Sequence, residues 1–321
     1  MIWLTWRQHR RQLLASVAGL VALAAVLVPT GIAMHHAFER LGLAQCLSAA
    51  ATAGCPKKFD DFTNAYGTFV FLAVLLLVLP LLIGIFWGAP VVAREVEQGT
   101  HRMVWTQGIT RRRWILTKVS LLGAAVTVFA LLYGLGTAWW WEPMSRIDSD
   151  QSRFGAVFFD LQGIAPVGYT LFAVALGIAA GTAIPKVVPA MGVTLAGFIV
   201  VRVAVAIAAR PRFMRPETSE WLVASGPGRR REAGAGSWIM STTVHQADGT
   251  YVMDGTMRCP LPADGGCQSD NDFGVRAGAY NLDTFQPADR YWTFQAIETA
   301  IFVLLAALLI LWTVRRLRSV F

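Results

Sequence analysis

Six long apolar segments constrain the fold of this sequence more than any other feature. They cover roughly residues 13–34, 66–92, 115–139, 166–184, 187–208 and 292–314. At about 1.5 Å per residue, each is long enough to cross about 30 Å of hydrocarbon as a helix. Hydrophobic residues make up 55% of the chain, which excludes an ordinary soluble domain. We therefore predict an all-α membrane protein with six transmembrane helices.

The basic residues predict the orientation of these spans. One side of the membrane would receive Arg7, Arg10, Arg11, Arg94, Arg102, Arg111, Arg112, Arg113, Lys118, Lys186, Arg315, Arg316 and Arg318. The two shorter loops on the other side hold only Arg40, Lys57, Lys58, Arg146 and Arg153. The positive-inside rule then places both termini in the cytoplasm. Because the basic residues sit mainly at span ends, the net charge of +8 implies no nucleic-acid partner.

A polar connection, residues 94–114, joins the second and third spans. Gly99 can end the preceding helix in a left-handed conformation, and Thr100 suits the N-cap of a new short helix. One face of that helix would carry His101, Val104 and Trp105. A helix this short does not persist alone because its nucleation is costly. It therefore needs a surface to lie on, either the bilayer or a partner protein.

The order of residues in this connection resembles the first cytoplasmic loop of ABC (ATP-binding cassette) permeases of the type-2 export class. The resemblance rests on Glu95-x-Glu97-x-Gly99-Thr100, an apolar pair, and then Arg111 before an apolar span. In that family the loop is a coupling helix that docks on an ATPase subunit. The resemblance thus assigns the ATPase contact to Glu95, Glu97, Gly99, Thr100, His101, Val104, Trp105 and Arg111. The alternative is an ordinary basic loop held by its charge.

Two further stretches, 185–191 and 289–295, together with Arg202 in the fifth span, are similar to the bacterial subgroup of this family. The resemblance implies a permease subunit of the bacterial plasma membrane that exports an amphipathic or lipid-like substrate. A six-span chain cannot enclose a pathway alone. We therefore expect a second permease chain, as a homodimer, two copies of the ATPase subunit, and contact with membrane lipid.

The sequence holds no GxxxxGK[ST] phosphate loop, so we expect no ATPase site on this chain. ATP and Mg would bind to the partner ATPase, and no cofactor or metal is expected on the permease itself. Two other functions stay open. One is a membrane enzyme that acts on lipid precursors, which would need polar catalytic residues near an interface. The other is a sensor or scaffold whose outer segment binds a ligand.

The residues between the fifth and sixth spans predict a small extracellular module over 210–291, which separates residues 1–209 from 292–321. This segment is rich in Gly, Asp, Ser and Pro, and residues 238–244 and 250–253 flank an Asp248-Gly249 turn. That pattern predicts a β-hairpin. The module could serve as a lid, a gate or a partner platform, or be a solvated insertion.

The cysteines agree with an oxidising exterior on the side of this module. Cys46 and Cys55 lie in the first outer loop, and Cys259 and Cys267 lie in the last. Four cysteines permit three pairings, of which the two local bridges, Cys46 to Cys55 and Cys259 to Cys267, are the simplest. A zinc site is the rival interpretation, but neither CxxC spacing nor histidine pairs support it.

Two charges lie clearly inside predicted spans. Arg202 is eight residues from Arg210, about 12 Å, and Glu298 is six residues from Trp292, about 9 Å, so their depths match. Charges inside a membrane are costly unless they are paired or hydrated. We therefore predict an ion pair between Arg202 and Glu298, within one chain or across the dimer. Alternatively, Arg202 snorkels outward and Glu298 meets water at the interface.

Two other polar or aromatic groups are interpreted as surface features. Asp148, Asp150 and Asp160 form an acidic outer loop and are interpreted as a solvated face. The run Trp139-Trp140-Trp141 ends the third span and is interpreted as an anchor in the headgroup region.

Overall fold

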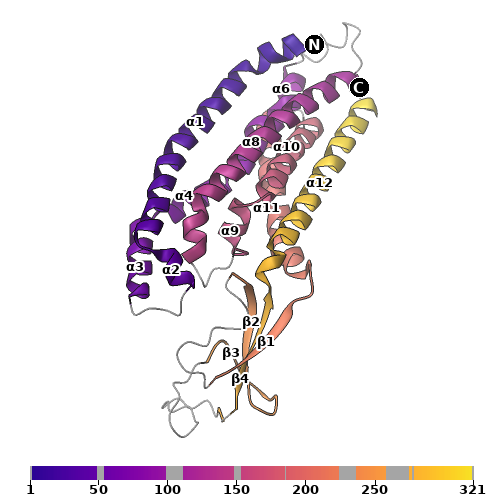
Figure 1. Cartoon of the computed structure of the whole chain (residues 1–321). Coiled ribbons are helices and arrows are strands. Elements are labelled where there is room, and N and C mark those ends of the chain that lie inside the picture. The colour runs from indigo at the N-terminus through magenta and orange to yellow at the C-terminus, as the bar shows by residue number, and fades with distance from the viewer. Residues whose placement is uncertain are drawn as a thin grey trace.

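The computed structural model describes residues 2–48, 54–98, 111–147, 153–184, 186–223, 236–257, 275–276 and 278–319. In these residues, six helices are long and apolar enough to cross a membrane. They cover Val17–Arg40, Phe69–Arg94, Val119–Ile147, Ala165–Ala183, Val187–Arg212 and Ala288–Arg316. The predicted class, an all-α membrane protein with six spans, is confirmed. A β-sheet lies beyond one end of the helical bundle (Figure 1).

The helices pair their backbone polar groups within each span, as an apolar environment requires. The helical elements are α1 (Ile2–Arg40), α2 (Leu43–Ser48), α3 (Cys55–Tyr66), α4 (Phe69–Leu77), α5 (Leu79–Ile83), the π-turn η1 (Gly84–Gly88), α6 (Ala89–Glu97), α8 (Arg111–Ile147), α9 (Ala156–Leu161), α10 (Ala165–Ala183), α11 (Val187–Ala204), the π-turn η2 (Val205–Ala209), the 3-10 turns η3 (Arg210–Arg212) and η4 (Ala288–Arg290), and α12 (Tyr291–Ser319).

Figure 1 gives the bundle two distinct ends. At the terminal end, α1 begins and α12 finishes. At the sheet end, η4 connects the β-sheet to the start of α12. The short helices α2 and α3 also lie toward the sheet end in Figure 1. A disulfide between Cys46 and Cys55 joins these two helices, with the Cα atoms 5.7 Å apart. Cys259 and Cys267 lie outside the described residues.

Helix α10 is the centre of the bundle. In its most apolar stretch 78% of the residues are buried, against 17% to 33% in the other five spans. Glycines allow η1 and α6 to approach it closely: a Cβ atom at Gly177 would lie 2.5 Å from the Gly84 carbonyl oxygen, and one at Gly181 would lie 2.5 Å from that of Ala89. Small residues spaced four apart let helices in membranes pack backbone to backbone. The second and fourth spans therefore interlock along this seam.

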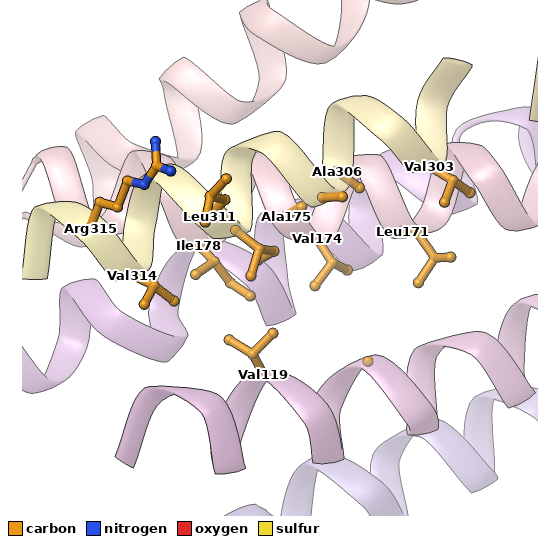
Figure 2. A pocket seen from close by; sticks show the side chains of 13 residues that line it. Val119, Leu171, Val174, Ala175, Ile178, Val303, Ala306, Leu311, Val314 and Arg315 are labelled. Atoms are coloured by element: carbon orange, nitrogen blue, oxygen red, sulfur yellow. The ribbon is translucent and has the colours of Figure 1, made fainter. Parts of the chain in front are cut away.

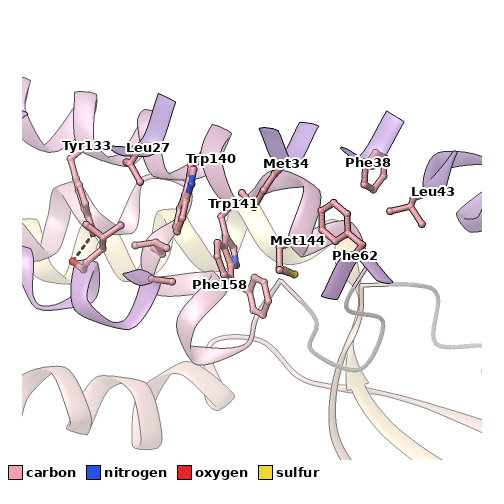
Figure 3. Packing of buried hydrophobic residues seen from close by; sticks show 13 residues of the cluster. Leu27, Met34, Phe38, Leu43, Phe62, Tyr133, Trp140, Trp141, Met144 and Phe158 are labelled. Atoms are coloured by element: carbon pink, nitrogen blue, oxygen red, sulfur yellow. Dashed lines mark hydrogen bonds between the residues drawn. The ribbon is translucent and has the colours of Figure 1, made fainter. Parts of the chain in front are cut away.

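A second packed region joins α1, α4 and α8 near the sheet end (Figure 3). Trp140 and Trp141 are 0% and 1% exposed, and the Trp140 indole N–H donates to the Thr30 hydroxyl at 2.9 Å. The prediction of a headgroup anchor is wrong for these two residues. Successive helical residues point in directions about 100° apart, so three adjacent tryptophans cannot share one lipid-facing side. Trp139, which is 41% exposed, is the one of the three that faces outward.

The sheet between the fifth and sixth spans has four antiparallel strands in the order β1-β4-β2-β3. These are β1 (Glu217–Leu222), β2 (Trp238–His245), β3 (Tyr251–Asp254) and β4 (Tyr280–Gln286). The predicted hairpin is confirmed as β2 and β3, whose turn places Gly249 at φ +87°. In that turn Asp248 accepts a hydrogen bond from the Thr250 backbone N–H, which lowers the pKa of the Asp248 carboxyl.

Aromatic packing attaches the sheet to the bundle. The ring of Trp238 in β2 stacks on Phe154 with centroids 5.8 Å apart, and it meets the edge of Phe294 in α12 at 6.4 Å. Phe154 and Phe294 are 2% and 0% exposed. The sheet is therefore packed against the segment before α9 and against the first turns of the last span.

Candidate functional site

Four charged side chains from three parts of the chain meet in the bundle close to its sheet end. Arg202 and Arg210 come from the fifth span, Asp160 from α9, and Glu298 from α12. Their side chains are 16%, 4%, 14% and 0% exposed in that order. We call these four residues the charge cluster. With two guanidinium groups and two carboxylates, its formal charge is zero.

Glu298 is the most enclosed member of the charge cluster. Its Oε1 atom accepts hydrogen bonds from Arg202 Nη1 at 2.9 Å, from Arg210 Nη2 at 2.8 Å and from the Tyr169 hydroxyl at 2.6 Å. Its Oε2 atom accepts another from Arg210 Nε at 2.7 Å. The structure thus brings Arg202 and Glu298 together within one chain, as their matching depths predict. It does so as part of a larger network.

Asp160 is the second carboxylate of the network, and the interpretation of this residue as part of a solvated face is wrong. Its Oδ1 atom accepts a hydrogen bond from Arg210 Nη2 at 2.7 Å, and its carboxylate also forms an ion pair with Arg202. The reason is its apolar neighbours. Phe158, Phe159 and Leu161 are 4%, 0% and 0% exposed, and their burial draws α9 into the bundle.

The sequence places Arg210 at the outer end of the fifth span and assigns it no partner. In a regular α-helix, residues eight positions apart differ in direction by about 80°, so Arg202 and Arg210 would point to different sides. The π-turn η2 lies between them, and its wider turn lowers the rotation per residue. This brings both guanidinium groups to Glu298.

Aromatic faces cover the two guanidinium groups. The Cζ atom of Arg202 lies 3.6 Å from the ring centroid of Tyr169, and that of Arg210 lies 4.1 Å from the centroid of Phe159. Cation–π contacts strengthen when water is excluded. Each charge therefore has both an ionic partner and an aromatic neighbour. Such an arrangement can hold α9, α10, α11 and α12 in a fixed relation near the sheet end.

A buried glutamine beside the charge cluster ties the same elements together. It lies in the stretch 289–295 that resembles the bacterial subgroup, but the resemblance assigns it no role. The Gln295 side-chain oxygen accepts hydrogen bonds from the backbone N–H groups of Ile164 and Ala165, at 3.2 and 2.8 Å, at the start of α10. Its amide group donates to the Phe159 carbonyl at 2.7 Å. These bonds satisfy N–H groups that a helix leaves unpaired at its N-terminus.

The predicted coupling residues that the structure describes lie at the terminal end of the bundle (Figure 1). Glu97 is the last residue of α6, and its Oε2 atom accepts a hydrogen bond from the Val187 backbone N–H at 3.1 Å. The carboxylate thereby caps the first turn of α11, where the helix dipole favours negative charge. The end of the second span is thus bonded to the start of the fifth.

Two other predicted coupling residues lie in helices at this end. The backbone of Glu95 is part of α6, and the backbone of Arg111 begins α8. Outside the described residues lie Gly99, Thr100, His101, Val104 and Trp105. The coupling helix itself stays a prediction. In the part of the chain that the structure describes, there is no cluster of three or more His, Cys, Asp or Glu residues suited to a metal.

The part of the sequence that holds most of the spans matches a known protein family. The model of the family described as ABC-2 membrane transporter related matches residues 17–210, which is more than half of the chain. The chain belongs to the ABC-2 membrane transporter related family. Membership bears out the resemblance to type-2 ABC permeases, and it makes this chain a membrane component of a transport system. Comparisons with curated proteins and with solved structures gave no match.

The matched range of this ABC-2 permease contains Glu97 but only three of the four residues of the charge cluster. Asp160, Arg202 and Arg210 of the charge cluster fall inside the matched range, as does Glu97, whereas Glu298 and the β-sheet lie beyond it. The charge cluster thus joins the matched part of the chain to the last span.

Proposed function

We propose that this permease is the membrane-spanning subunit of an ATP-driven ABC exporter of the bacterial plasma membrane. It moves an amphipathic or lipid-like substrate outward, and the energy comes from a separate ATPase subunit. The observation that carries the proposal is the family match over residues 17–210. Six apolar spans with polar connections at both ends agree with this role.

The terminal end of the bundle is the proposed docking side for the ATPase. Helix α6 ends and α8 begins at this end (Figure 1), and Glu97, the last residue of α6, is bonded to the first turn of α11. A push on the connection between α6 and α8 would therefore reach the second and fifth spans together. Because α10 interlocks with η1 and α6, the fourth span would follow. In this view one contact sets three spans in motion.

The proposed orientation has the terminal end in the cytoplasm and the sheet outside. Arginine and lysine residues at the terminal end, including Arg94, Lys186 and Arg315, support it through the positive-inside rule. The disulfide between Cys46 and Cys55 lies toward the sheet end and supports it independently, because disulfides persist in oxidising compartments. The sheet then serves as an extracellular module.

The working unit in this proposal is a permease homodimer with two ATPase copies. The exposed faces of α1, α11 and α12 are apolar, with Val21, Val200 and Leu304 each at least 60% exposed. Such faces suit lipid contact or a second copy. The transport path would lie between the two permease chains.

Two measurements test the proposal. First, the tagged permease is purified from its native membranes in mild detergent, and an ABC ATPase subunit with orthovanadate-sensitive ATP hydrolysis should co-purify. Second, the complex is placed in proteoliposomes, and ATPase stimulation by lipid-like and amphipathic compounds is compared between variants. Glu97→Gln and Gly99→Val should lower the stimulated rate while the complex stays assembled.

The matched control is Glu220→Gln, an exposed carboxylate on β1 at the far end of the molecule. It should leave stimulation unchanged. If no ATPase co-purifies, or if both Glu97→Gln and Gly99→Val couple normally, the proposed function is wrong.

A further inference from the structure

A groove runs along the outside of α10 between α8 and α12. Its volume is about 670 Å³, within the range of roughly 300–1,000 Å³ that small-molecule sites occupy. Except for Arg315, its lining is made of aliphatic residues and one glycine. Figure 2 shows Arg315 near one end of the groove and Val303 near the other, with Val119 of α8 facing Ile178 of α10.

The dimensions and polarity of this groove match one lipid molecule in one leaflet. Along α12, Val303 and Arg315 are twelve residues apart, which corresponds to about 18 Å. Half of a bilayer's hydrocarbon core is about 15 Å. Arg315 is next to the last residue of its span, at the level of the headgroups, whereas Val303 lies near the middle of the span. A polar group at one end and an apolar path to the membrane centre are the features of a phospholipid.

The charge at the headgroup level favours an anionic lipid. Arg315 is exposed, and no ion pair with it is found among the described residues. Basic pockets between spans at the level of the headgroups bind anionic lipids. A second copy of the chain fits less well, because two identical concave grooves brought face to face leave a void between them.

We infer that the groove between α8, α10 and α12 binds an anionic phospholipid, with an acyl chain along α10 and the headgroup phosphate at Arg315. The inference needs only that these helices span a membrane. It does not depend on the exporter function, so the two can fail separately.

The structure offers variants that fill the groove without disturbing its walls. A Cβ atom at Gly123 meets no atom within 4 Å, so a side chain there would enter open space in the groove. Ala307 also lines the groove and is exposed, which gives a second filling position. Gly136 lies on the same helix outside the groove, and its Cβ would likewise meet nothing within 4 Å. Gly136→Phe is therefore the matched control for Gly123→Phe.

The experiment is native mass spectrometry of the purified full chain with equal amounts of dioleoyl phosphatidylglycerol and dioleoyl phosphatidylcholine. The unmodified protein should retain the anionic lipid about fivefold more, since one basic side chain near an anionic headgroup contributes a factor of about that size. Arg315→Ala should abolish the preference, and Arg315→Lys should keep it. Arg316→Ala, at the next position and outside the groove lining, should change nothing.

Gly123→Phe and Ala307→Phe should each displace both lipids, while Gly136→Phe retains them. The inference is overturned if the preference survives Arg315→Ala, or if filling the groove leaves lipid retention unchanged. It is also overturned if Ala307→Cys crosslinks two chains in the membrane, because a second copy then covers the groove.

Discussion

Removal of the Glu298 charge should destabilise the permease strongly, and the charge cluster explains why. Glu298→Gln keeps the size of the side chain but removes one of two negative charges, which leaves two guanidinium groups facing Asp160 alone. The variant also weakens four hydrogen bonds at 2.6 to 2.9 Å that the carboxylate accepts. Loss of one partner from a buried ion pair costs about 3–5 kcal/mol.

That free energy corresponds to a fall in the unfolding midpoint on the order of 10 °C for a chain of this size. The assay is thermal unfolding of the purified protein in one detergent, followed by the loss of the monodisperse peak in fluorescence-detected size-exclusion chromatography. Glu217→Gln is the matched control. Glu217 also pairs with an arginine, Arg290, but its side chain is 51% exposed, so its loss should cost less than about 1 kcal/mol.

Second-site changes test the network rather than the single residue. Arg202→Gln combined with Glu298→Gln leaves one positive and one negative charge and should recover part of the lost stability. An exchange of the two side chains, Arg202→Glu with Glu298→Arg, should not recover it, because the new carboxylate would face Asp160 and the new guanidinium group would face Arg210. A midpoint for Glu298→Gln within about 2 °C of the unmodified protein, or full rescue by the exchange, would refute the four-charge network.

Two further predictions concern packing and sidedness. Gly177→Val should lower the unfolding midpoint by several degrees, because its Cβ would lie 2.5 Å from the Gly84 carbonyl oxygen. Such overpacking costs about 1–3 kcal/mol. The control Gly192→Val should leave the midpoint unchanged, because a Cβ there meets nothing within 4 Å. Cys55→Ser should free the thiol of Cys46, which is partly exposed, for labelling by a membrane-impermeant maleimide on intact cells, whereas Cys55 itself is only 2% exposed. The labelling should exceed that of a variant with serine at both positions. Labelling only after permeabilisation would reverse the orientation.

Hydropathy predicted the spans because burial in lipid demands long apolar helices, and it located Arg202 and Glu298 because charges stand out inside them. The other half of the charge cluster could not be predicted in this way because it depends on departures from regular structure. Arg210 reaches Glu298 only through the π-turn η2. Asp160 follows Asp148 and Asp150 in the loop between the third and fourth spans, which favours a solvated face, and only the burial of its apolar neighbours in α9 shows otherwise.

The sheet shows a different limit of pattern reasoning. The β2–β3 hairpin has a turn signal, but β4 reverses the usual alternation of polar and apolar residues. Asn281 and Asp283 are among its buried residues, both 0% exposed. Asp283 accepts a hydrogen bond from the Trp221 indole N–H at 2.9 Å, and Asn281 bonds to the backbone of Met257. A strand whose core side is polar is not detected by a search for apolar periodicity.

The Glu97 contact and the charge cluster lie at opposite ends of one interlocked group of helices, and they differ in strength. At the terminal end, the Glu97 carboxylate accepts one hydrogen bond from the Val187 backbone N–H, beside apolar contacts between small residues of α6 and α11. At the sheet end, the charge cluster links α9, the fifth span and α12 through several ionic contacts, and Tyr169 of α10 joins it through a hydrogen bond and a cation–π contact. An exposed hydrogen bond beside small apolar side chains is more easily broken than a network of buried charges. We therefore expect the spans to move apart first at the terminal end and to pivot about the charge cluster.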